Sequence, residues 1–363
     1  MTEISSKIVK ILEEFWQRNK AKGLLAQTIF KEEIHKNYFG EDAKEKIISG
    51  CWLLAPKEEN FYKFRFCFFV HPRFMKEDDI SSDVRKILGE NYRPFHALAG
   101  FMNNAGIGVV YAIPFNRDGE LPLDEIKSRR FGNIEWFFLG FQKGVFCPLD
   151  INKFFGKWEG NRGRAGYGRG WEDSVRRRME LLDENILTEL LLNELFYTGF
   201  LKTILKKPVS DPYDIDIFLI SISQKYIFPV EIKEKFPGEN KKEKFFGIDA
   251  GRVMMLLRLC IPNDANAIYL IREVNRRGEF IGWKYITLSD IIMTASWNLQ
   301  RGGVGMGGQD TQTIRLPYRY FKKFSKEEIS EDNLRRIGTL PKDVKVLARK
   351  FGEEMFLRFY NNC

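Results

Sequence analysis

The segment 210–235 constrains the fold more than any other part of the chain. Its sequence, SDPYDIDIFLISISQKYIFPVEIKEK, holds two runs of apolar and β-branched residues separated by a short polar stretch. Such runs are typical of strands that lie inside a sheet and are buried on both faces. We therefore predict two antiparallel strands, IFLIS and YIFPV, joined by a turn near residues 223–225.

Charged side chains stand at the ends of these two strands. Asp214 and Asp216 begin the first strand, and Glu231 and Lys233 end the second. Because side chains alternate along a strand, the two aspartates share one face, and Glu231 and Lys233 share one face while Ile232 points away. Antiparallel pairing would place Asp216 opposite the end of the second strand. Two carboxylates and an ammonium group are therefore predicted to meet.

This combination of side chains suits hydrolysis of a phosphodiester bond. The reaction needs a cation to offset charge on the phosphoryl oxygens and a water made nucleophilic near neutral pH. Mg²⁺ prefers oxygen ligands and keeps several waters, so a few carboxylates suffice. We assign Lys233 to position or deprotonate the attacking water, or to stabilise the phosphoryl charge. The candidate metal ligands are Asp216, Glu231, the carbonyl group of Ile232, and Asp214.

The same residues also permit a purely structural interpretation. In that case the aspartates only begin a strand, while Glu231 and Lys233 form a solvated pair on an exposed sheet edge. The apolar character of both strands opposes this interpretation, because unpaired charges inside a sheet are costly. Pro229 favours it, because proline lacks an N–H and is usually confined to an edge or a bulge.

The order D-I-D, four apolar residues, a turn and V-E-I-K resembles the PD-(D/E)xK nuclease superfamily over about residues 171–274. The resemblance implies a restriction-endonuclease-like mixed sheet flanked by helices, a DNA substrate, and Mg²⁺ as cofactor with Mn²⁺ as a substitute. It also implies a glutamate on the helix before the first core strand. Glu189 is the best match for this catalytic glutamate, and Glu194 and Glu184 are the alternatives.

The chain is expected to be α/β, with an N-terminal α+β domain over 1–158 that supplies substrate recognition. Residues 159–170, with five glycines and three arginines, are predicted to be a linker. The nuclease domain is expected over 171–323, beginning with a long helix that ends at Gly199. Residues 324–363 are expected to form helices, two of them amphipathic and separated by 338–341.

Candidate contacts to nucleic acid are scattered along the chain. The 58 lysines and arginines exceed the 49 acids, and the net charge of +9 is compatible with a polyanionic partner. The segment GGVGMGG at 302–308 follows a predicted helix and lacks a Gly-Lys-Ser/Thr ending, so it is not a nucleotide-binding P-loop. The candidate contact residues are Arg162, Arg164 and Arg169 in the linker, Lys235, and Gln309. A solvated hinge and a mobile loop are the alternative interpretations of the linker and the glycine-rich segment.

Other classes of site receive no support from the sequence. The five cysteines are scattered without a Cys-x-x-Cys pair or a nearby histidine, so we expect neither a zinc nor an iron–sulfur site. No run approaches the ~18 consecutive apolar residues of a membrane span, and the polar N-terminus has no signal-peptide core. We therefore expect a cytoplasmic protein without a membrane partner.

Taken together, these features predict a Mg²⁺-dependent endonuclease that hydrolyses DNA. A role resembling that of a type II restriction enzyme fits best, because the chain is larger than a minimal resolvase and carries no helicase motifs. A homodimer is predicted, since it would allow both strands to be cut. Two alternatives stay open. One is a structure-selective repair, recombination or defence nuclease acting on branched or single-stranded nucleic acid; the other is a catalytically inactive nucleic-acid-binding protein.

Overall fold

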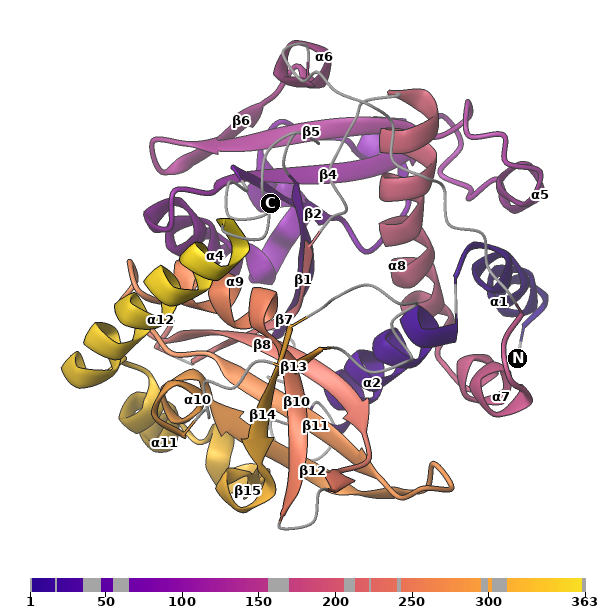
Figure 1. Cartoon of the computed structure of the whole chain (residues 1–363). Helices are drawn as coiled ribbons and strands as arrows, with labels where there is room; N and C mark the ends of the chain where they lie inside the picture. Colours follow the sequence, from indigo (N-terminus) through magenta and orange to yellow (C-terminus); the bar gives the residue numbers. More distant parts are fainter. Residues whose placement is uncertain are drawn as a thin grey trace. The chain divides into compact units, whose positions relative to one another are not determined.

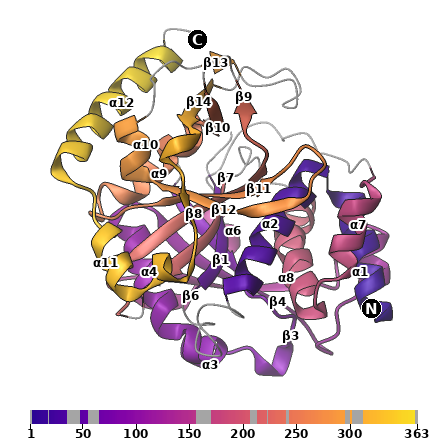
Figure 2. The ribbon, with the colours of Figure 1, turned by 90° about the horizontal axis from the view of Figure 1, so that it is seen from below.

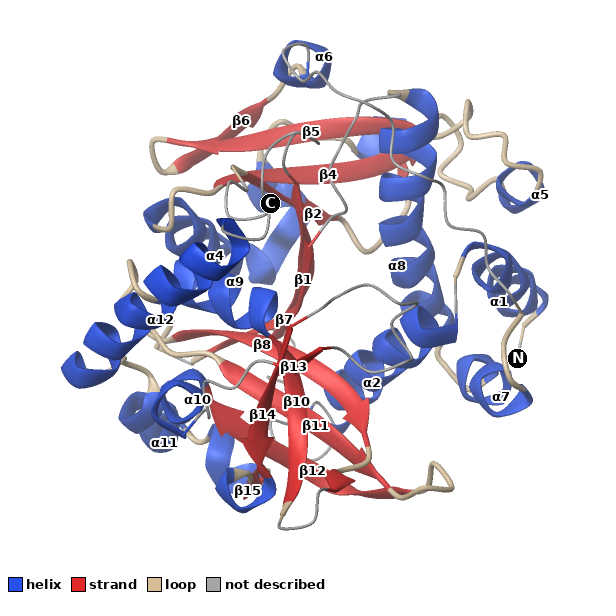
Figure 3. Cartoon of the chain, viewed as in Figure 1, coloured by secondary structure: helices blue, strands red, loops and turns tan. Residues whose placement is uncertain are grey.

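The chain is α/β, with mixed sheets flanked by helices (Figures 1 and 3). A computed structural model describes residues 2–16, 18–34, 47–54, 65–155, 170–205, 213–221, 223–239, 243–294, 300–301 and 312–360. The chain divides into two compact units, one made of Met1–Phe30 and Gly50–Ile215 and the other of Lys31–Ser49 and Asp216–Cys363. The division falls inside three elements, α2 (Arg18–Ile34), β1 (Ile47–Leu54) and β7 (Tyr213–Ile220).

The first unit is built on a mixed sheet with the strand order β1-β2-β4-β5-β6, and β3 lies beside β4. Strands β2 and β4 are parallel, as are β3 and β4, and the other neighbours are antiparallel. After β1, the strands are β2 (Phe66–Val70), β3 (Met75–Lys76), β4 (Gly108–Asn116), β5 (Glu135–Gln142) and β6 (Val145–Pro148). The described part of residues 1–158 therefore holds both strands and helices, as expected.

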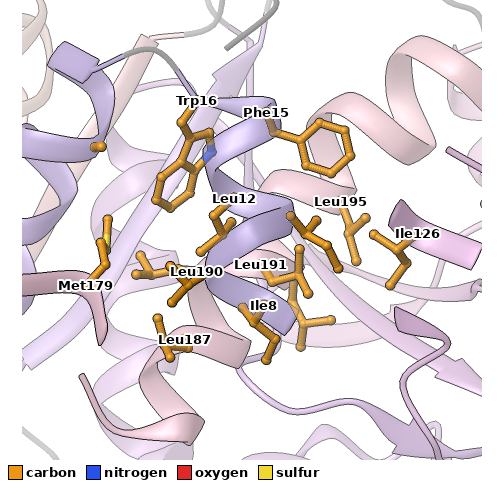
Figure 4. Close-up of a cluster of buried hydrophobic side chains, with 14 of the residues drawn as sticks. Ile8, Leu12, Phe15, Trp16, Ile126, Met179, Leu187, Leu190, Leu191 and Leu195 are labelled. Carbon is orange, nitrogen blue, oxygen red and sulfur yellow. The ribbon is translucent and has the colours of Figure 1, made fainter. Parts of the chain in front are cut away.

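Helices pack together beside this sheet, and their apolar spacing explains why. In α1 (Glu3–Phe15) the apolar residues Ile8, Leu12 and Phe15 follow one another at four- and three-residue steps, and all three are buried. In both views α1, α7 (Asp173–Glu180) and α8 (Glu184–Glu194) lie side by side (Figures 1 and 2). Figure 4 shows their shared core, which includes Ile8, Leu12, Phe15, Trp16, Ile126, Met179, Leu187, Leu190, Leu191 and Leu195.

The helices of the first unit vary widely in length. They are α1 (Glu3–Phe15), α3 (Val84–Leu88), α4 (Tyr92–Asn104), α5 (Leu123–Lys127), α6 (Ile151–Phe155), α7 (Asp173–Glu180) and α8 (Glu184–Glu194), with the short turns η4 (Glu77–Asp79) and η5 (Gly89–Asn91).

The helix that was expected to end at Gly199 does not end there. It continues as a π-helical segment, η6 (Leu195–Ile204), through and beyond the glycine. Gly199 is not among the residues with positive φ, so it does not form a left-handed cap. A Cβ at this position would lie 3.2 Å from Phe131 Cδ1, so the glycine instead permits close packing of the helix. The prediction for Gly199 was therefore wrong.

A buried histidine in the first unit gives a test of acid stability. His71 Nδ1 lies 2.7 Å from the hydroxyl oxygen of Tyr111, and burial, with a contribution from Arg73, lowers the pKa of His71 to about 4. In the unfolded chain the pKa of His71 is near 6.5. The contribution of neutral, buried His71 to the free energy of unfolding is therefore complete above pH 6.5, and it is lost as the pH falls from 6.5 toward 4. Over this range the free energy of unfolding should fall by about 3 kcal/mol.

The variant His71→Gln keeps a hydrogen-bonding side chain but cannot titrate. We expect its free energy of unfolding, measured in urea, to fall less than that of the unaltered chain between pH 7 and pH 4. Parallel curves for the two proteins would show that His71 is not the titrating group.

The second unit contains part of a mixed sheet, with the strand order β15-β12-β11-β8-β7. Strands β8 and β11 run parallel, and the other neighbours are antiparallel. Its strands are β7, β8 (Ile227–Lys235), β11 (Ile268–Val274), β12 (Phe280–Thr287) and β15 (Lys322–Lys323). The predicted hairpin of β7 and β8 is confirmed, and β8 is an interior strand.

A second, antiparallel sheet has the order β13-β14-β10-β9. It is made of β9 (Gly238–Glu239), β10 (Lys244–Asp249), β13 (Gln300–Arg301) and β14 (Gln312–Pro317). The helices of this unit are α9 (Ala250–Cys260), α10 (Leu288–Thr294), α11 (Glu331–Ile337) and α12 (Lys342–Tyr360), with the turns η8 (Tyr318–Tyr320) and η9 (Lys326–Ile329). Helices α9, α10 and α12 lie together in both views (Figures 1 and 2), and the two predicted C-terminal helices are confirmed.

The observed units differ from the expected domains. Helices α7 and α8 belong to the first unit, because their apolar faces share a core with α1, whereas a boundary before residue 171 was expected. Residues 156–169, which include most of the expected linker, lie outside the described residues. None of the described helices is long and apolar enough to cross a membrane.

Candidate active site

The hairpin of β7 and β8 brings the predicted carboxylates together. The register pairs Ile217 with Val230, so the next position places Asp216 opposite Glu231. Both side chains are buried, Asp216 with 4% and Glu231 with 1% of its surface exposed. A solvated pair on an exposed edge is therefore excluded for Glu231, since β8 lies between β7 and β11.

The strands part at this point because a side chain replaces a main-chain acceptor. Asp216 Oδ2 accepts a hydrogen bond from the backbone N–H of Ile232 at 2.5 Å. In a strand the N–H and C=O of one residue point to the same neighbour, so the carbonyl of Ile232 is directed toward the side of β7. This arrangement fixes the Asp216 carboxylate against β8 and orients a third oxygen donor in its direction.

Two cations surround the Glu231 carboxylate. Lys233 Nζ lies 2.8 Å and Arg252 Nε lies 3.4 Å from Glu231 Oε1. Neither contact has hydrogen-bond geometry, and within the described residues this buried oxygen accepts no hydrogen bond. The Lys233 side chain keeps 35% of its surface exposed. Its ammonium group can therefore contact both the buried carboxylate and a ligand arriving from solvent.

Arg252 was not among the predicted site residues. It lies in the first turn of α9, which Asp249 caps by accepting a hydrogen bond from Gly251 N at 2.7 Å. Asp249 is thus the N-terminal cap of α9. Arg252 is the one charged side chain in the otherwise apolar stretch AGRVMMLL, and that isolation was the signal available in the sequence.

Tyr269 lies beside Glu231 on the neighbouring strand and is hydrogen-bonded to Gly247. Tyr269 on β11 is in register with Glu231, and its hydroxyl donates to Gly247 O at 2.8 Å. Burial raises the pKa of the Tyr269 hydroxyl well above its usual value, and the charges of Glu231 and Asp216 add to the shift. Tyr269 therefore stays protonated, and its hydroxyl proton is donated to Gly247 O.

Lys235 has an internal partner. Its ammonium group donates to the same carbonyl oxygen, Gly247 O on β10. Burial, aided by the positive charge of Lys233, lowers the pKa of Lys235 to about 8. The predicted contact of Lys235 with nucleic acid would compete with this hydrogen bond.

The remaining predicted residues are distributed over the chain. Glu189 lies on α8 in the first unit, where its charge contributes, after burial, to raising the pKa of Tyr111. Asp214 shares a face of β7 with Asp216 but is assigned to the first unit. The last four candidates, Arg162, Arg164, Arg169 and Gln309, lie outside the described residues.

The donor atoms of the site fit a hard divalent cation. Across the described part of the chain, no three His, Cys, Asp or Glu side chains gather in a group that could hold a metal ion. Mg²⁺, however, is commonly bound through one or two carboxylates and keeps several waters. Asp216, Glu231 and the carbonyl of Ile232 match that requirement, and the buried Glu231 Oε1 accepts no hydrogen bond there.

Comparison of the chain with family models, with curated proteins and with solved structures gave no match. The function is therefore inferred from the geometry of the site and from the family resemblance of residues 171–274.

Proposed function

We propose that the chain is a Mg²⁺-dependent endonuclease that hydrolyses phosphodiester bonds in DNA, with a role resembling that of a type II restriction enzyme. The observation that carries the proposal is the position of Asp216 opposite Glu231, with Lys233 Nζ 2.8 Å from the Glu231 carboxylate. Two buried carboxylates beside a half-exposed ammonium group are poorly explained by stability, because burying charges is costly.

Each residue has a defined task in this proposal. The Asp216 and Glu231 carboxylates, with the carbonyl of Ile232, hold the cation, which when bound would offset phosphoryl charge and lower the pKa of a water. Lys233 orients or deprotonates the attacking water and places a positive charge beside the phosphoryl oxygens. Arg252 holds Glu231 from the side of α9 and adds a second positive charge.

The finer parts of the proposal come from the family resemblance. Glu189 is proposed as the catalytic glutamate of the preceding helix, and Asp214 as an additional ligand. A homodimer would present two such sites to the two strands of a duplex. The expectation for Glu189 is a lower cleavage rate in Glu189→Gln with an unchanged unfolding temperature.

The proposal is tested by incubating the purified chain with supercoiled plasmid, single-stranded DNA and branched DNA. We expect cleavage of the duplex in Mg²⁺ or Mn²⁺ and none in EDTA. Mapping the ends on mixed-sequence DNA should give defined termini, because a restriction-type enzyme reads base edges in the groove.

Other outcomes would favour the alternatives. Preference for branched or single-stranded substrates would indicate a structure-selective nuclease. Salt-sensitive binding without cleavage in any metal would indicate a nucleic-acid-binding protein and would overturn the proposal.

A further inference from the structure

The hairpin between β11 and β12 has an ordered turn. Asn275 Oδ1 accepts hydrogen bonds from the backbone N–H groups of Arg277 at 2.9 Å and Glu279 at 3.0 Å. Two backbone bonds, Gly278 N to Asn275 O and Asn275 N to Glu279 O, close the loop, both at 2.9 Å. Gly278 has φ of 84°, which glycine adopts without strain. The turn therefore holds the backbone of Arg276 and Arg277 in a defined conformation.

Two arginines at this tip have no partner among the described residues. Arg276 and Arg277 are exposed, and neither guanidinium group forms an ion pair or a hydrogen bond within the part of the chain that the structure describes. The nearest acid of the turn, Glu279, is held by Asn275 Nδ2 at 2.6 Å. By contrast Arg272, lower on the same hairpin, is paired with Glu234 at 2.8 Å.

Apolar side chains accompany these cations. Phe280 has 45% and Ile281 has 59% of its surface exposed. The guanidinium carbon of Arg272 lies 4.6 Å from the centre of the Phe280 ring, which holds that ring in place. Figure 3 shows the turn between β11 and β12 projecting beyond the ends of the strands. The projecting β11–β12 hairpin thus combines two exposed arginines, Arg276 and Arg277, with exposed apolar side chains.

The position of the turn relative to Lys233 follows from the register. Ile271 on β11 is in register with Lys233 on β8, and the two strands are parallel. Val274, the last residue of β11, follows Ile271 by three residues, so at ~3.3 Å per residue the turn begins roughly 10 Å beyond Lys233 along the strands. This is less than one ~34 Å turn of B-form DNA, so one duplex can reach both the turn and Lys233.

We propose that the β11–β12 hairpin docks in the major groove of duplex DNA, where Arg276 and Arg277 neutralise backbone phosphates. A two-stranded ribbon fits the major groove of B-DNA, whereas the major groove of A-form RNA is too deep and narrow to admit it. If the proposed nuclease function also holds, the contact lies within one helical turn of the phosphate at Lys233.

Binding without divalent metal tests this inference separately from catalysis. Fluorescence anisotropy in EDTA, with a short mixed-sequence duplex, would compare the unaltered chain with the double variant Arg276→Gln/Arg277→Gln. We expect weaker binding and a slope of log K against log salt reduced in magnitude by roughly 2, because two phosphate contacts are lost. The variant Arg276→Lys/Arg277→Lys should retain most of the slope.

Arg335→Gln/Arg336→Gln is the matched control. It removes the same charge from exposed arginines of the same unit, but these contact Asp332 and Asn333 on their own helix. An equal loss of binding in the control, no loss in the hairpin variant, or an equal effect on duplex RNA would each overturn the inference.

The two proposals fail in different ways. If the hairpin variant binds DNA normally while the unaltered chain cleaves it, the hairpin inference is wrong and the nuclease proposal stands. If binding depends on the hairpin but no metal supports cleavage, the nuclease proposal is wrong and the inference stands.

Discussion

Replacing Glu231 with glutamine is expected to lower the rate of DNA cleavage by roughly 10³-fold. The substitution preserves the size of the side chain but removes a charged oxygen ligand, and metal stabilisation of a phosphoryl transition state is worth several kcal/mol. Glu231 Oε1 would also become, in one of two orientations, an amide donor facing Lys233 and Arg252, which are 2.8 and 3.4 Å away. Both the metal site and the position of Lys233 would be disturbed.

The substitution should cost little stability in comparison. It removes one charge from a group of three, and the Lys233 ammonium can turn toward water because its side chain is 35% exposed. We expect the free energy of unfolding to change by about 1–3 kcal/mol. Cleavage should therefore be measured well below the unfolding temperature, together with Mn²⁺ binding by calorimetry, which should weaken in parallel.

Matched substitutions separate the site from general effects of charge. Lys233→Met should lower cleavage by about 10²–10⁴-fold without abolishing Mn²⁺ binding, because a base or positioning group is lost rather than a ligand. Glu239→Gln and Lys244→Met are the control variants, because these two residues are a carboxylate and an ammonium group in register on β9 and β10. Both variants should cleave DNA at the normal rate. Undiminished cutting by Glu231→Gln or Lys233→Met would remove the basis of the nuclease proposal.

The meeting of Asp216 and Glu231 was predictable because it depends on local rules. Apolar runs of strand length, a turn between them and the two-residue repeat of side chains fix which residues face each other. Pro229, which seemed to oppose an interior strand, lies opposite Phe218 and one residue before the pairing of β8 with β11 begins at Val230. The absence of an N–H at Pro229 therefore removes no hydrogen bond between β8 and β11.

The parts that escaped prediction depend on distant contacts. Arg252 reaches Glu231 only because α9 returns the chain beside β8, and Tyr269 joins the site through a parallel pairing. The boundary expected before residue 171 depended on glycine content, whereas α7 and α8 are held by their apolar contacts with α1. Periodicity shows that one face of a helix or strand is buried, but it does not show which element that face packs against. These contacts could therefore not be predicted from the sequence.

A different glutamate, Glu194, is expected to matter for stability rather than chemistry. It was an alternative for the catalytic helix glutamate, yet only 4% of its surface is exposed and its carboxylate is surrounded by donors. Trp16 Nε1 donates to Oε2 at 2.7 Å, the Lys20 ammonium group contacts the same oxygen, and Thr198 donates to Oε1. These bonds join α1 and α2 to the junction of α8 and η6.

Glu194→Ala should therefore destabilise the first unit by about 3–5 kcal/mol, because it leaves a buried indole N–H and an ammonium group without their acceptor. Glu184→Ala, in the first turn of α8, is the control and should cost about 1 kcal/mol or less. Urea unfolding followed by tryptophan fluorescence, to which Trp16 contributes as one of seven tryptophans, would measure the change in stability.

The activity of the folded fraction decides between the two roles of Glu194. If the residue is structural, the Glu194→Ala protein that remains folded at low temperature should cleave DNA at an unchanged rate per molecule. Glu194→Gln should recover part of the lost stability, since its amide oxygen can still accept from Trp16. A large loss of cleavage without a loss of stability would instead make Glu194, and not Glu189, the helix glutamate that the family resemblance implies.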